Sequence, residues 1–290
     1  MITLFQQRDF GEKINATFTF IGREFKPFIT SLLYIVGPLA LATGITAGIY
    51  QSNILALNRS QGSELPFDTL ARVFSPAYFL MVFFSILSNI LVNLTTYSYM
   101  KLYHERSGGV LSVSDVWDEV RRHIVASLLF SFISFVAIAV ASVFFLIPGL
   151  YVGVALSLGI VVLVFEETDF GATWSRCFQL IRDKWWSTFG LILIMFIIVM
   201  ISNLVFSIPA GIVSMLVSMK LVPDMPSIVT IMTNTLSTVG STLMTALLAM
   251  ALGFQYTNLV ERHHGTGLLS AIDSIGSSQN RPNSADEGEF

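Results

Sequence analysis

The sequence predicts an all-α membrane protein with six transmembrane helices, and three observations lead to this class. The chain of 290 residues is 53% hydrophobic and only 12% charged, whereas soluble domains carry about 25% charged residues. Its charged residues are crowded between long apolar blocks, and its mean hydropathy is +0.71. Basic residues are also concentrated in alternate connecting segments, as expected for a chain that crosses a bilayer several times.

Six apolar blocks supply the predicted spans. Each is nearly or fully free of ionisable side chains, and a bilayer core about 30 Å thick needs roughly 20 such helical residues. The blocks are residues 28–50, 77–100, 124–146, 150–165, 188–219 and 227–260. The fourth block is short, and the last two are long enough that we expect them to tilt, kink or project.

Proline and glycine predict where these helices bend or turn. Proline removes a helical hydrogen bond, so Gly37-Pro38 predicts a kink in the first block and Pro209 predicts one in the fifth. The third and fourth blocks are separated only by the sequence IPG. One helix through both blocks would be too long for a bilayer, so we expect a tight helical hairpin that turns at Pro148-Gly149.

The distribution of basic residues predicts the orientation. The N-terminal segment, the second-to-third and fourth-to-fifth connections and the C-terminal tail together hold thirteen Lys and Arg residues, and the opposite side holds three. The positive-inside rule assigns the larger set to the cytoplasm. We therefore expect a multi-pass protein of the bacterial cytoplasmic (inner) membrane with both termini in the cytoplasm, where residues 277–290 form a disordered tail.

Two polar, aromatic-bearing segments share one pattern. Five apolar positions, spaced as on one face of a helix, recur 160 residues later: Phe10, Ile14, Phe18, Ile21 and Phe25, then Phe170, Trp174, Phe178, Ile181 and Trp185. Each segment leads into a span, and each half ends through Tyr99 or Tyr256 into a cluster of His, Glu and Arg.

This pattern predicts a parallel internal repeat within one membrane domain over residues 1–276. Repeat A covers about 9–120, a central hairpin covers 124–165, and repeat B covers about 169–276. The alternative is that any helix lying at the membrane interface before a span has this pattern.

The two repeated helices are too polar to cross a bilayer and too apolar for free solution, so we expect them along the cytoplasmic interface. Tryptophan favours headgroup depth, and basic side chains there attract anionic lipids. The predicted headgroup-binding residues are Arg23, Lys26, Arg176, Arg182, Lys184, Trp185 and Trp186. The alternative is that the aromatic faces pack on protein and the charges only flank the spans.

The spans hold small polar residues but no ionisable side chain near their centres, which argues against a proton-driven transporter. In the sixth block a ridge of small residues recurs every four positions: Thr233, Ser237, Ser241, Thr245, Ala249 and Gly253. Such a ridge lets another helix approach closely, and it can also line a polar groove. The predicted cavity-lining or helix-bridging residues are Asn89, Asn93, Asn203, Asn234, Ser237, Ser241 and Thr245.

No pattern in the chain indicates a catalytic, cofactor or metal site. The DFG sequence that begins at Asp169 lacks the other signatures of a kinase. Cys177 has no neighbouring base in the sequence, and we expect it to be a packed thiol. The net charge of −3 gives no support for nucleic-acid binding.

The middle of the chain resembles a known family over about residues 143–192. The matching features are the sequence IPGLY, an acidic end of the span, and a basic-aromatic helix end: Ile147 to Tyr151, Glu166 or Glu167, Arg182, Lys184, Trp185, Trp186 and Gly190. This segment is similar to the membrane domain of bacterial glycerophosphoryl diester phosphodiesterases and related uncharacterised polytopic proteins, with Cys177 in place of a common serine. In those enzymes a separate soluble barrel carries out hydrolysis, so the resemblance implies a membrane module for lipid or envelope work.

We therefore expect a non-catalytic inner-membrane protein that interacts with lipid or acts as a scaffolding component of the cell envelope. Its expected partners are membrane lipids, anionic ones among them, and another membrane protein. The alternative expectation is a facilitator or exporter of a small amphiphilic or neutral substrate. A membrane enzyme is a weaker third choice, because no acid, base or metal set is clustered.

Overall fold

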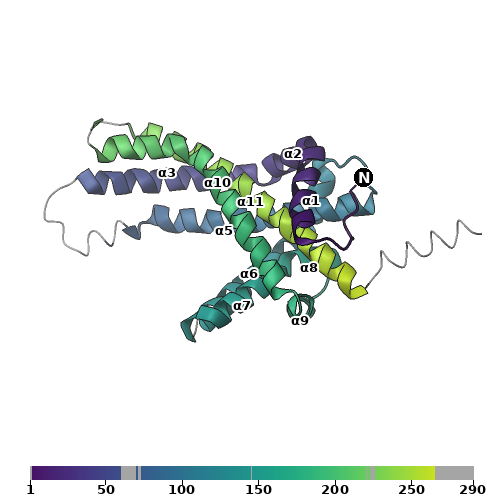
Figure 1. The fold of residues 1–290 in the computed structure, drawn as a ribbon. Coiled ribbons are helices and arrows are strands. Elements are labelled where there is room, and N and C mark those ends of the chain that lie inside the picture. The colour runs from purple at the N-terminus through teal and green to yellow at the C-terminus, as the bar shows by residue number, and fades with distance from the viewer. Residues whose placement is uncertain are drawn as a thin grey trace, which may run out of the picture.

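The computed structural model describes residues 2–59, 70, 73–144, 146–219, 221–222 and 226–264, and every regular element in these ranges is a helix (Figure 1). The helices are α1 (Phe10–Arg23), α2 (Phe25–Ile35), α3 (Gly37–Arg59), α5 (Pro76–Glu105), α6 (Val113–Phe144), α7 (Leu146–Leu156), α8 (Gly159–Glu166), α9 (Phe170–Ile181), α10 (Trp185–Ser218) and α11 (Ser227–His264). The predicted tail, the end of repeat B and most of the connection between the first two spans lie outside the described residues.

Five helical segments are long and apolar enough to cross a membrane: α5, α6, the α7–α8 segment, α10 and α11. A sixth span results if α2 and α3 are counted together, although they are bent by 58° at the break between them. This bend confirms the kink predicted at Gly37-Pro38, where the proline nitrogen cannot continue the hydrogen-bond ladder. The all-helical, multi-pass architecture agrees with the sequence.

The hairpin between the third and fourth blocks does not turn where the sequence predicted. Helix α6 ends at Phe144 and α7 begins at Leu146, so Pro148 and Gly149 lie in the first turn of α7. Proline is tolerated there, because the first N–H groups of a helix have no partner within it. Gly149 instead allows α6 and α7 to touch, since an added Cβ would overlap the side chain of Ser142.

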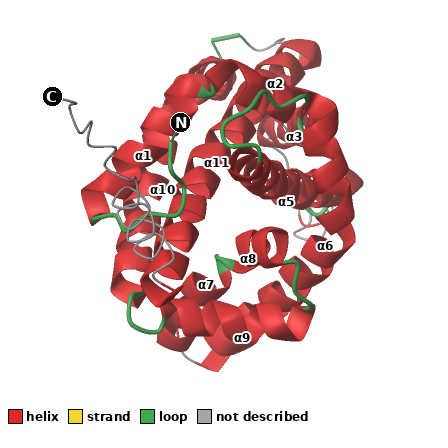
Figure 2. Cartoon of the chain, turned by 90° about the vertical axis from the view of Figure 1, so that its right-hand side faces the viewer, coloured by secondary structure: helices red, strands yellow, loops and turns green. Residues whose placement is uncertain are grey.

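Helix α11 is the centre of the bundle and contacts α3, α5 and α10. Helix α10 contains Pro209, and its ribbon changes direction along its length (Figure 1). Helices α6 and α7 leave the bundle at an angle in the same view. In both views α2 and α9 lie at opposite edges of the molecule, at the top and the bottom (Figures 1 and 2).

The largest core lies at the end of the bundle where α1 packs against the C-terminal parts of α5 and α11. Its fully buried aromatic residues come from four helices, α1, α2, α5 and α11: Phe20, Phe28, Tyr97, Tyr99, Phe254 and Tyr256. Farther along the bundle, many apolar side chains point outwards, such as Phe79 and Leu204, each 60% exposed. Such an outer surface suits lipid and not water.

Candidate functional site

The two repeated segments begin and pack in the same way. Asp9 and Asp169 are the N-caps of α1 and α9, with nearly identical backbone angles of φ −72°, ψ 170° and φ −71°, ψ 171°. Three buried positions of α1 recur 160 residues later in α9: Lys13, Thr17 and Phe20, then Thr173, Cys177 and Leu180. The two helices therefore turn equivalent faces towards the protein.

The buried face of α1 is not the predicted apolar face. Phe18 and Phe25 are 44% and 54% exposed, whereas Lys13 is buried. The polar atoms of Lys13 are satisfied inside the protein, because its ammonium donates to Gln255 Oε1 at 2.7 Å and to Ser187 Oγ at 3.1 Å. Burial nonetheless lowers the pKa of Lys13 to about 8, since it disfavours the charged form.

The predicted headgroup residues do not form one site. The Arg176 Nε donates to Glu166 Oε1 at 2.9 Å, so this charge is paired within the protein. Arg182, Trp185 and Trp186 line one cavity, while Lys184 lines another with Arg262 and His263. The other two predicted residues, at the junction of α1 and α2, are exposed to the surroundings: Arg23 and Lys26.

We call the first of these the aromatic cavity; it has a volume of about 760 Å³. It lies between α7 and the start of α10 and is lined by Ile147, Leu150, Tyr151, Arg182, Asp183, Trp185, Trp186 and Phe189. The Trp185 ring stacks on Phe189 (5.3 Å between centroids, 7° between planes) and on Tyr151 (5.9 Å, 17°). Trp186 is 77% exposed, so one wall faces outwards.

A second cavity, the polar cavity, lies between α3, α5, α10 and α11 and has a volume of about 270 Å³. All of its lining side chains carry a hydroxyl or an amide and none is ionisable: Thr43, Ser85, Ser88, Asn89, Asn203, Ser237, Thr238, Ser241, Thr242 and Thr245. Five residues that the sequence singled out therefore meet here. The other two do not line it: Asn93 donates to Asn89 on the preceding turn, and Asn234 donates to the Thr230 carbonyl.

The small-residue ridge of the sixth block has two separate roles. Its middle part, Ser237 to Thr245, faces the polar cavity. Its last glycine, Gly253, packs on α5, where an added Cβ would overlap Met100. The close contact with α3 uses a different face of α11, because Gly44 and Gly48 lie against the backbone of positions 235 and 231.

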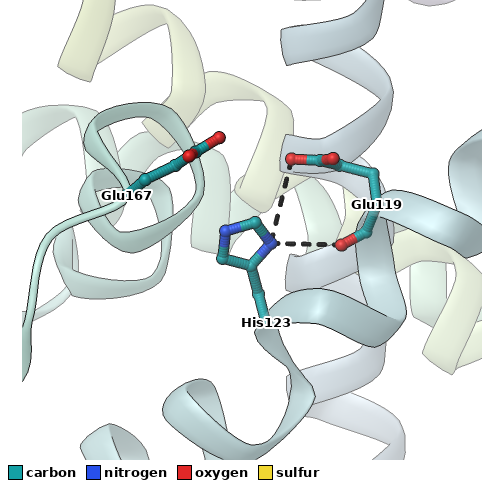
Figure 3. A group of neighbouring side chains, drawn as sticks. All are labelled: Glu119, His123 and Glu167. Atoms are coloured by element: carbon teal, nitrogen blue, oxygen red, sulfur yellow. Dashed lines mark hydrogen bonds and ion pairs between the residues drawn. The ribbon is translucent and has the colours of Figure 1, made fainter.

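A charged cluster joins α5, α6 and the start of the loop after α8. Glu119 and His123, one turn apart on α6, lie near Glu167, and one ligand atom from each lies within 4.8 Å of the others (Figure 3). This donor set has the chemistry of a metal site. In this arrangement, however, the ammonium of Lys101 lies 2.8 Å from Glu119 Oε1 and also contacts Glu167, so both carboxylates already have a cationic partner.

Sequence reasoning missed this cluster. Its only local signal is the spacing of four between Glu119 and His123, because Lys101 and Glu167 are brought to it by the fold. Glu167 also has a left-handed backbone, with φ 50°, which is uncommon outside glycine. The hydrogen bond from Lys101 lowers the pKa of Glu167 below its ordinary value.

Cys177 is a buried thiol on the face of α9 that packs into the core. Burial raises the pKa of Cys177 to about 12, so the reactive thiolate is scarce at neutral pH.

No family model, no curated protein and no solved structure matches this chain.

Proposed function

We propose that this chain is a non-catalytic integral protein of the bacterial inner membrane that binds phospholipid and serves as a lipid-interacting or scaffolding component of the envelope. The aromatic cavity is the observation that carries this proposal. Its volume of about 760 Å³ falls within the range of roughly 300–1,000 Å³ typical of ligand sites. Its wall of stacked rings offers an apolar surface to an acyl chain.

The chemistry of the rim supports a phosphate contact. Arg182 carries a planar guanidinium whose donors match phosphate oxygens, and Trp185 and Trp186 lie beside it, as tryptophans do at headgroup depth. Asp183 lies on the same rim, so the cavity is not uniformly basic. We therefore assign to it the phosphate that phospholipids share, and not a preference for net negative headgroups.

Three further arguments support the proposal. The charge count puts Arg182 and both termini among the cytoplasmic residues. The resemblance of residues 143–192 to the membrane domain of glycerophosphoryl diester phosphodiesterases points to the same kind of work. The matched burial of α1 and α9 supports a parallel repeat in which both helices lie along the interface.

Lipid retention on purification tests the proposal. We expect Arg182→Gln to lower the amount of phospholipid that mass spectrometry finds on the purified protein about ten-fold or more, because a hydrogen bond to a charged group contributes about 1.5–3 kcal/mol. Lys184→Gln is the matched control, since it removes one charge from the same segment but lines a different cavity. Equal losses in both variants, or none in Arg182→Gln, would show that these charges only flank the spans.

A further inference from the structure

The polar cavity lies among apolar helices, at a depth where unsatisfied polar groups are costly. Thr43 and Ser88 close its back wall through a 3.0 Å hydrogen bond, and both side chains are buried. Ser85 and Asn89 lie on its exposed side. The lining residues come from four helices, and on α5 Asn89 lies about three turns before Lys101 of the charged cluster.

Several polar groups of this cavity lack a partner within the described protein. The hydroxyls of Ser237, Thr238 and Ser241 make no hydrogen bond to any described residue, and neither does the buried Oδ1 of Asn203. The hydrocarbon interior offers these groups nothing to bind. The hydroxyls of Thr43, Thr242 and Thr245 donate to carbonyls of their own helices. The groups left without a partner border a space of about 270 Å³, where molecules that enter it can satisfy them.

We infer that the polar cavity binds small neutral solutes rich in hydrogen-bonding groups, of the polyol class. Its lining has no ionisable side chain, so a charged solute would lose hydration without gaining a counter-charge. At roughly 30 Å³ per water molecule, its 270 Å³ corresponds to on the order of nine waters, or one three- or four-carbon polyol with some water. The hydroxyl groups that line the cavity can donate or accept hydrogen bonds, so they can pair with polyol hydroxyls acting as acceptors or as donors. This inference does not rest on the aromatic cavity.

Thiol labelling measures whether the cavity is hydrated and what enters it. Single cysteines at Ser241 and, separately, at Leu236 are introduced into a Cys177→Ser background, and the protein is kept in lipid bilayers. Leu236 is the control, because it lies on the same helix but is 58% exposed on the outer surface. A small neutral maleimide reports hydration, since it reacts with the thiolate form. We expect Ser241→Cys to react at least ten-fold faster than Leu236→Cys.

Protection by solutes identifies the ligand class. Glycerol should slow labelling of Ser241→Cys several-fold. Sucrose at equal osmolality should not slow it, because sucrose is too large for the cavity, and choline should not slow it, because choline is charged. Equal labelling rates in the two variants would overturn the inference, because the cavity would then not be hydrated. Fast labelling without glycerol protection would also overturn it, because the cavity would hold water only. Ser237→Cys, a second near-isosteric change, repeats the measurement if the first variant unfolds.

Discussion

The contact between α3 and α11 at Gly48 gives the sharpest test of the fold. A Cβ added to Gly48 would lie 2.6 Å from Ile231 Cα and 3.0 Å from its carbonyl oxygen. Both are backbone atoms, so no rotation of a side chain relieves the overlap. The two helices must separate by roughly 1 Å to restore the ~3.5 Å contact distance.

Gly48→Ala should therefore destabilise the protein, and Gly211→Ala supplies the reference. Overpacking costs about 1–3 kcal/mol, while replacing glycine by alanine within a helix contributes about 1 kcal/mol of stability. Gly211 lies in α10 with nothing within 4 Å of its added Cβ, so its variant reports the helical gain alone. The difference between the two variants isolates the overlap and should be about 1–3 kcal/mol.

Reversible unfolding in mixed micelles, followed by tryptophan fluorescence, measures that difference. Gly48→Ala should unfold at a lower denaturant concentration than the wild type, and Gly211→Ala at an equal or higher one. If both variants are equally stable, the close approach of α3 and α11 at this position is wrong.

Two further predictions concern buried charges. Lys101→Met should lower the free energy of unfolding by up to about 3 kcal/mol, because it removes the buried ammonium and leaves the buried Glu119 carboxylate with only the exposed Arg122 guanidinium at 3.3 Å and the His123 ring. Glu167→Gln should cost no more than ~1 kcal/mol, because that carboxylate is 64% exposed. Equal effects of the two changes in thermal unfolding would contradict the assignment. Lys13 has a pKa of about 8 in the folded protein and an ordinary pKa of 10.5. Between these two pH values the unfolded chain holds a proton that the folded chain has released. The free energy of unfolding should therefore rise with pH over this range, by up to about 3 kcal/mol. Unfolding measured at several pH values should show no such rise for Lys13→Met and an unchanged rise for Lys26→Met. If the rise persists in Lys13→Met, another titrating group causes it.

The features predicted correctly from the sequence depend on local chemistry. Span lengths follow from runs of apolar residues, and the bend at Gly37-Pro38 follows from a missing N–H group. The starts of the helices α1 and α9 follow the repeated apolar pattern that begins at Phe10 and Phe170. None of these requires knowledge of a distant contact, so composition and spacing were sufficient.

The features that the sequence did not predict depend on which helix lies opposite. Lys13 is buried because Gln255, far along the chain, accepts from its ammonium. Gly149 touches Ser142 and so is not the hairpin turn. Periodicity identified a small-residue ridge in α11 but not the change in its surroundings, from the polar cavity near Ser241 to close packing at Gly253.

The two ends of the bundle are held together by different interactions, and this difference bears on function. At the end where α1 and α9 lie, ion pairs such as those of Lys101 and Arg176 join several helices around an aromatic core. Around the polar cavity, helices meet through glycine contacts such as Gly48 and through the hydroxyl pair of Thr43 and Ser88. These contacts fix the distances between the helices without using charged side chains. They leave an uncharged space lined by hydrogen-bonding groups in the apolar part of the molecule. Under the two proposals, a solute in the polar cavity would be selected by size and neutrality, whereas a lipid at the aromatic cavity would be selected by its phosphate.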